Sequence, residues 1–288
     1  MKKLVGLIRL MRPINCTMMG FAVIVGAALA DAHSLFISPL SSLFYGFFTG
    51  FLLTAASMAI NDYYDKEIDA INEPSRPIPS GLVKPKEAIA FAVALTFLGF
   101  STAILTNSKA PLQCFTTALI FWLISVSYVT FGKKTGFPGN LLVSACVSAP
   151  FIYGSLAISN LIKGNIWIFA AMVFLSNTGR EITKGIADMQ GDMTRNVKTI
   201  AVLYGARQAA VAAAVFYLLA VMLTPIPPLL NLVSVWFIPI VAVTDLGLIT
   251  SSIILLKNYS RKNAKRVKNQ VLGWFLIGLI AFIAGSIS

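Results

Sequence analysis

The sequence predicts an all-α membrane protein, a bundle of nine helices that cross the bilayer. Of its 288 residues, 57% are hydrophobic and only 12% are charged, whereas a soluble domain carries about 25% charged residues. The hydrophobic residues form long unbroken runs, and the basic residues gather in the segments between them. These three observations are typical of a polytopic membrane protein and not of a soluble enzyme.

Nine apolar runs are long enough to cross a bilayer, which takes about 20 residues of helix. Met1, Lys2 and Lys3 precede the first run in the manner of a signal peptide, but no cleavage site leads into a soluble domain, so we expect a retained first helix. No stretch of distinct composition separates the runs, and residues 1–288 are predicted to form a single domain. The nine runs cover residues 14–30, 40–60, 88–106, 112–131, 140–158, 166–183, 208–223, 232–256 and 271–287.

The placement of Lys and Arg predicts the orientation, because these residues concentrate in cytoplasmic loops. All 23 basic residues except Lys109 and Lys163 fall on the side of the N-terminus when the loops alternate. All 11 acidic residues except Asp31 and Asp245 share that side. We therefore expect a multi-pass protein of the cell membrane, with its N-terminus and its polar chemistry on the cytoplasmic side.

The net charge of +12 does not indicate nucleic-acid binding, since no basic, polar domain exists to host it. Six of the basic residues lie in the segment 257–268 without any acid. This segment is predicted to contact anionic lipid headgroups, at about 1 kcal/mol per charge near the surface. We therefore predict that the protein contacts membrane lipids and has no protein partner.

A first acidic cluster begins where the second apolar run ends. At about 100° per residue, Asn61, Asp62, Asp65 and Asp69 fall within about a third of the helix circumference. Carboxylates at this spacing repel one another unless a cation is bound. Mg²⁺ prefers such oxygen ligands and commonly bridges carboxylates to substrate phosphates. The alternative is a solvated helix whose charges are incidental.

A second acidic cluster follows the sixth run, where Glu181, Asp188 and Asp192 lie within about 40° of one another on a helix. Gly185 and Gly191 leave a loop open as the alternative for part of it. Acidic residues beside a membrane segment usually mark function. Because a diphosphate avoids bare carboxylates, both clusters predict a Mg²⁺-dependent phosphate site. Basic candidates for its phosphate oxygens are Arg76, Lys133, Lys134, Arg180, Lys184, Arg195 and Lys198.

The two clusters also carry a resemblance. The pattern Asn61-Asp62-x-x-Asp65-x-x-x-Asp69, continued by the run from Arg76 to Gly81, resembles the first signature of the UbiA intramembrane prenyltransferases. Asp188-x-x-x-Asp192 is similar to their second signature. Tyr128 followed by Lys133 and Lys134, and Arg12-Pro13 with Asn15, also match the family's pattern, whereas Ser75 and Ala187 depart from it.

The resemblance implies helices around a central cavity that opens to lipid, and a reaction that moves a prenyl group from its diphosphate to a lipophilic acceptor. It implies that Asp62, Asp65, Asp69, Asp188 and Asp192 are catalytic. One Mg²⁺ would be held by Asn61, Asp62, Asp65 and Asp69, and a second by Asp188 and Asp192 with Glu181. Substrate would be bound by Asn61, Arg76, Tyr128, Lys133, Lys134, Arg180, Lys184 and Lys198.

The pattern around Arg180-Glu181-Ile182 resembles an archaeal branch of the family most. That branch implies transfer of geranylgeranyl to the hydroxyl of geranylgeranylglyceryl phosphate, an acceptor that bears a phosphate, with formation of an ether in membrane lipid biosynthesis. An aromatic or chlorophyllide-like acceptor is the alternative within the family. A transporter is the alternative of another class, although the acids gather at one interface and not along a path. A phosphatidyltransferase is disfavoured because its compact Asp-Gly-x-x-Ala-Arg run is absent.

Overall fold

The computed structural model describes residues 2–33, 40–194 and 196–287, which form helices and turns without any strand. Their contacts divide the chain into two compact units. The first comprises Met1–Ala27, Ser34–Thr130 and Pro150–Ile162, and the second comprises Ala28–His33, Phe131–Ala149 and Lys163–Ser288. The predicted all-α class is confirmed, and the single domain stays a prediction.

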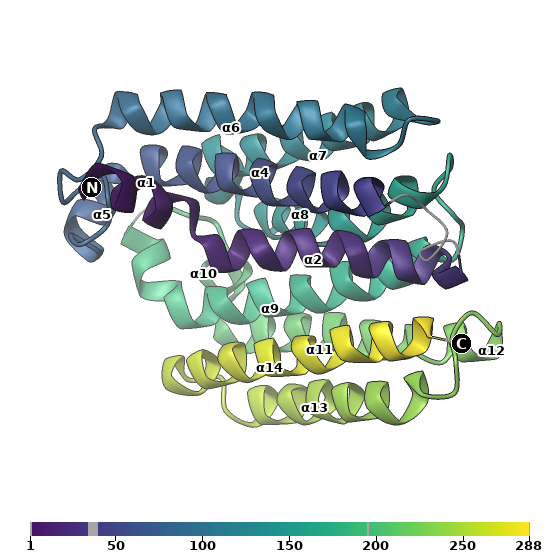
Figure 1. Ribbon diagram of the computed structural model, residues 1–288. Coiled ribbons are helices and arrows are strands. Elements are labelled where there is room, and N and C mark those ends of the chain that lie inside the picture. The colour runs from purple at the N-terminus through teal and green to yellow at the C-terminus, as the bar shows by residue number, and fades with distance from the viewer. Residues whose placement is uncertain (1, 34–39, 195, 288) are drawn as a thin grey trace. The chain divides into compact units, whose positions relative to one another are not determined.

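Helix α1 opens the first unit and ends just before Arg12, whose backbone has φ 52°. The sequence predicted one retained helix here, but Arg12 interrupts the chain and Pro13 starts α2 as a first helical residue. Helix α6 packs along α4 and α7 (Figure 1). The helices of this unit are α1 (Lys2–Met11), α2 (Pro13–Ala30), α4 (Leu40–Tyr64), α5 (Lys66–Asn72), α6 (Pro85–Thr106), α7 (Pro111–Thr130) and the second half of α8 (Phe137–Ile158).

Glycines let α2 and α8 touch through their backbones within the first unit. A Cβ added to Gly26 would lie 2.5 Å from the Phe151 backbone, and one added to Gly154 would collide with the Val23 carbonyl oxygen. Small residues at such contacts are typical of helices that pack in a membrane. The contact lies in the C-terminal half of α2, a helix that begins directly after Arg12 and so beside the first acidic cluster.

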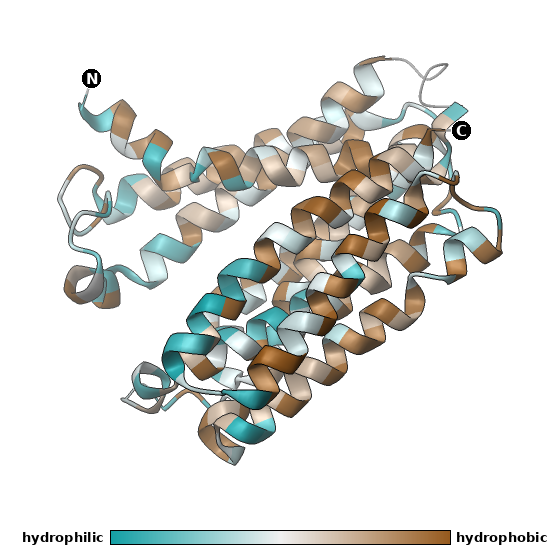
Figure 2. Ribbon diagram, turned by 90° about the horizontal axis from the view of Figure 1, so that it is seen from below, coloured by the Kyte–Doolittle hydropathy of each residue, from teal (hydrophilic) through white to brown (hydrophobic). Residues whose placement is uncertain are grey.

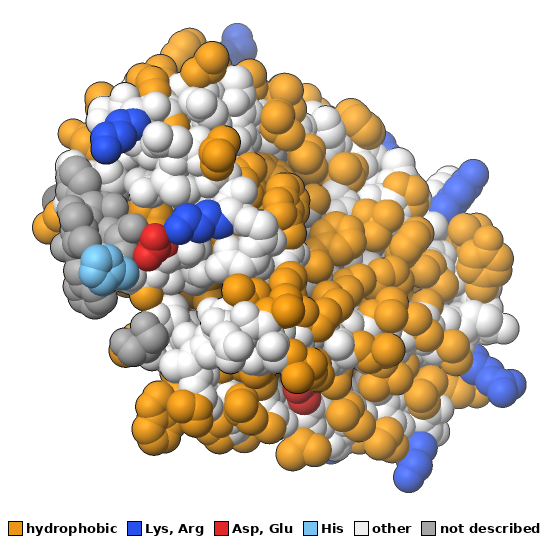
Figure 3. Space-filling view, turned by 90° about the vertical axis from the view of Figure 1, so that its right-hand side faces the viewer, with side chains coloured by type: hydrophobic (Ala, Val, Ile, Leu, Met, Phe, Trp, Pro, Cys, Tyr) orange, Lys and Arg blue, Asp and Glu red, His pale blue; other side chains and the backbone are white. Residues whose placement is uncertain are grey.

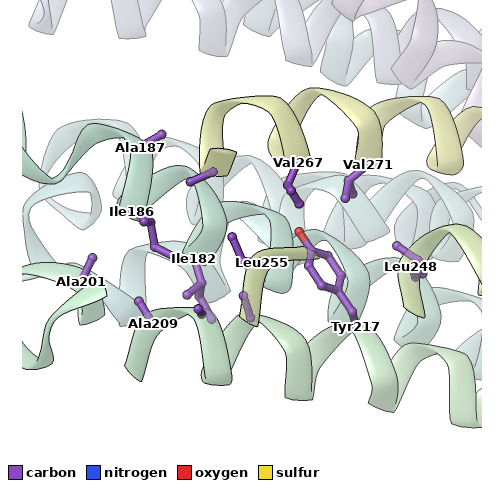
Figure 4. Close-up of a cluster of buried hydrophobic side chains, with 13 residues drawn as sticks. Ile182, Ile186, Ala187, Ala201, Ala209, Tyr217, Leu248, Leu255, Val267 and Val271 are labelled. Atoms are coloured by element: carbon purple, nitrogen blue, oxygen red, sulfur yellow. The ribbon is translucent and has the colours of Figure 1, made fainter. Parts of the chain in front are cut away.

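The second unit is built around α9, which packs against α11 and α14, while α13 packs on α11 and α14. Its core includes Tyr217, whose ring lies among Val267, Val271 and Leu248 (Figure 4). The Tyr217 hydroxyl is 3.0 Å from Thr183 Oγ1 on α9. The elements of this unit are the 3₁₀ turn η1 (Gly132–Thr135), the first half of α8, α9 (Ile166–Thr194), α10 (Ile200–Tyr204), α11 (Ala206–Leu223), α12 (Ile226–Leu229), α13 (Phe237–Lys257) and α14 (Arg261–Ser286).

Within the described residues, eight helical segments are long and apolar enough to cross a membrane. They coincide with eight of the nine predicted runs; the run at 166–183 forms the first part of α9, which is not among the eight. Side chains such as Leu246 and Phe97 are 64% and 70% exposed, as a surface against lipid requires. Hydrophobic residues run along the helices in Figure 2, and hydrophobic side chains are spread widely over the face seen in Figure 3. The chain is a multi-pass membrane protein.

Candidate active site

The first acidic cluster spans the joint between α4 and α5. Asp65 lies between the two helices with φ −88° and ψ 0°. The helical hydrogen-bond pattern nevertheless continues through it, because Asp65 N bonds to Asn61 O and Asp69 N bonds to Asp65 O, at 2.9 and 2.8 Å. The four polar side chains therefore keep nearly the helical spacing that the sequence predicted.

These side chains form two groups. Asn61 Nδ2 donates to Asp65 Oδ2 at 3.0 Å. Asp62 and Asp69 instead share one cation, since Arg76 Nη1 lies 3.5 Å from Asp62 Oδ1 and 2.6 Å from Asp69 Oδ2. Asp62 is only 3% exposed and Asp69 only 5%. Two buried carboxylates thus lie on either side of a positive charge, which offsets the cost of burying them.

Arg12 also belongs to this site; the sequence placed it in the Arg12-Pro13 pattern but predicted no role for it. Its Nη2 atom lies 2.5 Å from Asp62 Oδ1. The unusual φ of Arg12 turns the chain between α1 and α2. The available signal was a basic residue directly before the proline that starts a helix. Arg12 and Arg76 together give Asp62 two cationic partners.

Apolar side chains hold the loop that carries Arg76 against α1 and α4. Ile78 and Val83 are buried in one cluster with Leu10 of α1 and Ala59 of α4. Hydrogen bonds from Ser80 N to Arg76 O and from Val83 N to Pro77 O close its turns, at 3.0 Å each. The irregular loop predicted from its prolines is therefore an ordered structure that holds Arg76 against the acids.

Burial raises the pKa of Asp69 above its ordinary value of 3.8, while the hydrogen bond from Arg76 counteracts the rise, and the charges of Asp62 and Asp65 add to it. Among the described residues, no three acidic, histidine or cysteine side chains converge as a metal site by themselves. The position of Arg76 Nη1 between two carboxylates still shows that this set accepts a cation. The residues fit Mg²⁺ in donor chemistry, because all are oxygen ligands.

The second acidic cluster lies on one continuous helix, α9, so the loop alternative around Gly185 and Gly191 is wrong. Glu181 is buried and accepts from Arg180 Nη1 and from Lys184 Nζ, both at 3.0 Å. Asp188 is exposed and Asp192 is partly exposed. Arg180 Nε is buried without a hydrogen-bond partner among the described residues, so this guanidinium has an unused donor.

Three of the predicted phosphate-binding lysines come from segments that touch in the second unit. The turn η1 carries Lys133 and Lys134, and it is followed by Gly136, which has φ +72°. A Cβ added to Gly136 would collide with the carbonyl oxygen of Lys198. A Cβ added to Gly185 of α9 would lie 3.6 Å from Thr199 Cβ. The backbone thus connects α9, the segment of Lys198 and η1.

The remaining predicted residues are placed as follows. Tyr128 lies in the last turns of α7, in the first unit. Arg195 lies outside the described residues. The structure brings Asn61, Asp62, Asp65, Asp69 and Arg76 together in the first unit, and it brings Arg180, Glu181 and Lys184 together in the second.

Eight apolar helical segments define an integral membrane protein, and each of its two units carries its own group of paired acidic and basic side chains. The chain belongs to the UbiA prenyltransferase family, whose model matches residues 19–284.

Individual relatives agree with this assignment. The digeranylgeranylglyceryl phosphate synthase of Archaeoglobus fulgidus is 34% identical over 273 residues, which cover 93% of this chain and 91% of that protein. A solved structure from work on the biosynthesis of digeranylgeranylglyceryl phosphate synthase in membranes has a TM-score of 0.84 at 31% identity, covering 100% of this chain and 99% of that one. A UbiA homologue from Archaeoglobus fulgidus, solved bound to GPP and Mg²⁺, shares the fold with a TM-score of 0.65 at 16% identity, over 96% of this chain and 99% of that one.

Proposed function

We propose that this protein transfers a geranylgeranyl group from geranylgeranyl diphosphate to geranylgeranylglyceryl phosphate and so forms an ether bond of archaeal membrane lipids. The observation that carries the proposal is the 34% identity, over nearly the whole chain, to a digeranylgeranylglyceryl phosphate synthase. The first acidic cluster beside Arg76 supports the proposal. An enzyme that acts on a diphosphate needs oxygen ligands that bind a metal, and next to them a basic side chain that binds phosphate.

The metal of this proposal is Mg²⁺, as in the UbiA homologue that was solved with GPP and Mg²⁺. When bound, Mg²⁺ offsets the negative charge that develops on the leaving diphosphate. The first motif would contribute Asn61, Asp62, Asp65 and Asp69 as ligands. The second would contribute Asp188 and Asp192 with Glu181. Arg76, which contacts Asp62 and Asp69 in this structure, would contact phosphate oxygens when the diphosphate is bound.

The basic side chains would hold the phosphates that the metal leaves free. Lys133, Lys134 and Lys198 suit this role because backbone contacts join their segments. Arg180 suits it because its Nε–H has no partner in the described structure. Asn61 and Tyr128 would contact substrate, and Lys184 would move between Glu181 and a phosphate. These groups would fix the diphosphate while the acceptor hydroxyl attacks the allylic carbon.

The proposal includes a membrane arrangement. Helix α9 would add a crossing to the eight apolar segments and so bring their number to nine. Its first part is apolar and packs against α11 and α14. The chain would form one domain around a central cavity, with the N-terminus and both acidic motifs on the cytoplasmic side. The prenyl tail would occupy the cavity among the apolar helices, and no protein partner is part of the proposal.

One assay tests the proposed reaction. Purified protein receives labelled geranylgeranyl diphosphate, Mg²⁺ and, in separate reactions, geranylgeranylglyceryl phosphate, hydroxybenzoate, homogentisate or chlorophyllide. We expect label only in the glyceryl phosphate product, and none when a chelator replaces Mg²⁺. Label in an aromatic or chlorophyllide product alone would reassign the acceptor. Flux of a lipid substrate across proteoliposomes without any product would instead indicate a transporter.

A further inference from the structure

The second acidic cluster, Asp188 and Asp192, lies on a part of α9 that packs against the apolar core only through the partly buried Met189. The buried residues of α9 end at Ala187. Asp188 and Asp192 lie beyond it, in the last turns, where the described side chains are exposed or only partly covered. A helix end without buried side chains opens easily. Apolar packing through Met189 alone leaves these turns weakly held, so polar contacts matter for the position of the two carboxylates.

Arg261, the first residue of α14, contacts this end of α9. Its Nε donates to the Ala187 carbonyl oxygen at 3.1 Å, and its Nη1 donates to Gln190 Oε1 at 3.3 Å. The contact is anchored, because Ala264 and Val267 of α14 are buried in the same cluster as Ala187. Arg261 thus bonds to α9 on both sides of Asp188 in the sequence.

We propose that Arg261 is a positioning residue that holds the last turns of α9, and with them Asp188 and Asp192, ready to bind the metal. The inference rests on the proposed function, because that function makes these two aspartates ligands. Both acceptors of Arg261 are neutral, a backbone carbonyl and a side-chain amide. Metal binding therefore does not need to displace Arg261, in contrast to Arg76, which contacts the carboxylates themselves.

The same segment provides a matched control. The sequence predicted that all basic residues of 257–268 contact lipid headgroups, and Arg261 departs from this through its bonds to α9. Arg266 is exposed and forms no hydrogen bond or ion pair with the described part of the chain. Arg261→Gln and Arg266→Gln remove the same charge from the same helix, but only the first removes the contact with α9. Arg261→Lys keeps the charge and loses the planar fork of donors.

The first readout is hydrogen exchange of the metal-free protein, followed by mass spectrometry of peptides that cover residues 188–194. Because Arg261→Gln removes hydrogen bonds from a charged donor, we expect at least about tenfold faster exchange in this variant. Arg266→Gln should exchange like the unaltered protein, and Arg261→Lys should lie between the two. Equal exchange in the two glutamine variants would overturn the proposal.

The second readout is the Mg²⁺ concentration that gives half-maximal prenyl transfer. We expect it to rise about tenfold in Arg261→Gln, with less change in the rate at saturating Mg²⁺, and to stay unchanged in Arg266→Gln. Faster exchange with an unaltered Mg²⁺ requirement would refute the positioning role. If the unaltered protein transfers no prenyl group while the exchange result holds, the proposed function fails and the contact of Arg261 with α9 stands.

Discussion

Arg76 Nη1 lies 2.6 Å from Asp69 Oδ2, and so places a positive charge inside the first acidic motif. The same nitrogen lies 3.5 Å from Asp62 Oδ1. Asp62 of α4 and Asp69 of α5 therefore share the guanidinium of Arg76. Asp62 and Asp69 are both nearly buried, and without this charge their repulsion would oppose folding. The chain itself therefore arranges these two carboxylates around a positive charge.

The metal-binding role of the motifs predicts that Asp65→Ala and Asp192→Ala each abolish turnover. A bound metal ion contributes several kcal/mol to a transition state, so the loss should be at least about a hundredfold. Both variants should still insert and purify normally, because Asp65 and Asp192 are not part of an apolar core. The measurement is prenyl transfer in detergent with Mg²⁺. Full activity in either variant would remove that aspartate from the mechanism.

Loss of Arg76 should destabilise the protein in a pH-dependent manner. Arg76→Gln leaves Asp62 with Arg12 alone and leaves Asp69 without its charged partner, at a cost of about 1–3 kcal/mol near neutral pH. Burial already raises the pKa of Asp69 above 3.8, and without Arg76 the pKa rises further. A carboxyl with a raised pKa in the folded state costs stability when ionised, and the cost disappears once the pH falls below the unfolded value.

Thermal unfolding in detergent, measured from neutral pH down toward about pH 4, checks this sign. The difference between the unaltered protein and Arg76→Gln should be largest at neutral pH and should shrink on acidification. Arg76→Lys retains a charge and should lose less stability. A difference that grows as the pH falls would show that Arg76 does not compensate the carboxylate of Asp69.

The turn between η1 and α8 should be sensitive to one methyl group. Gly136→Ala forces a Cβ against the Lys198 carbonyl oxygen and should separate the segments of Lys133, Lys134 and Lys198. We expect a raised KM for the prenyl diphosphate. Gly81→Ala is the matched control, because Gly81 also has a positive φ, of 75°, but has open space around it. Equal effects of the two variants on KM would attribute the loss to backbone strain and not to the contact with Lys198.

The ion pair between Lys163 and Asp31 should contribute little. Its atoms lie 2.9 Å apart, but the two side chains are 40% and 29% exposed. Exposed pairs contribute about 0–1 kcal/mol, and this pair is predicted to lie on the membrane face opposite the acidic motifs. Lys163→Ala should therefore leave turnover unchanged and shift the unfolding temperature only slightly. A large loss of turnover would contradict the predicted sidedness.

Much of the fold follows from local patterns in the sequence. Apolar runs located eight of the membrane segments, because the bilayer sets both their length and their composition. Their ends were less predictable: α14 begins at Arg261, well before the run predicted at 271, since Lys and Arg are good helix formers in water. Helix α9 also continues through Gly185, because the packing of Ile182 and Ile186 outweighs the weak helix propensity of glycine. It continues through Gly191 as well, where a Cβ would meet no neighbour and packing gives no reason.

The candidate site was predictable only where it is local. The spacing of Asn61, Asp62, Asp65 and Asp69 along one helical stretch could be read directly. The contact of Arg12 with Asp62 joins residues 50 positions apart, and spacing along a helix carries no information about such a pair. The bonds of Arg261 to α9 are of the same kind. The packing of the helices decides which basic residues contact the acidic clusters, and local sequence patterns do not predict it.

The most direct test of the account is an anomalous-diffraction experiment on crystals that contain Mn²⁺ and a non-cleavable geranylgeranyl diphosphate analogue. The account predicts metal ions bound to one diphosphate, with ligands from both acidic motifs, Asp65 on one side and Asp192 on the other. Metal and diphosphate bound by one motif alone, with the other motif out of reach of the phosphates, would contradict it.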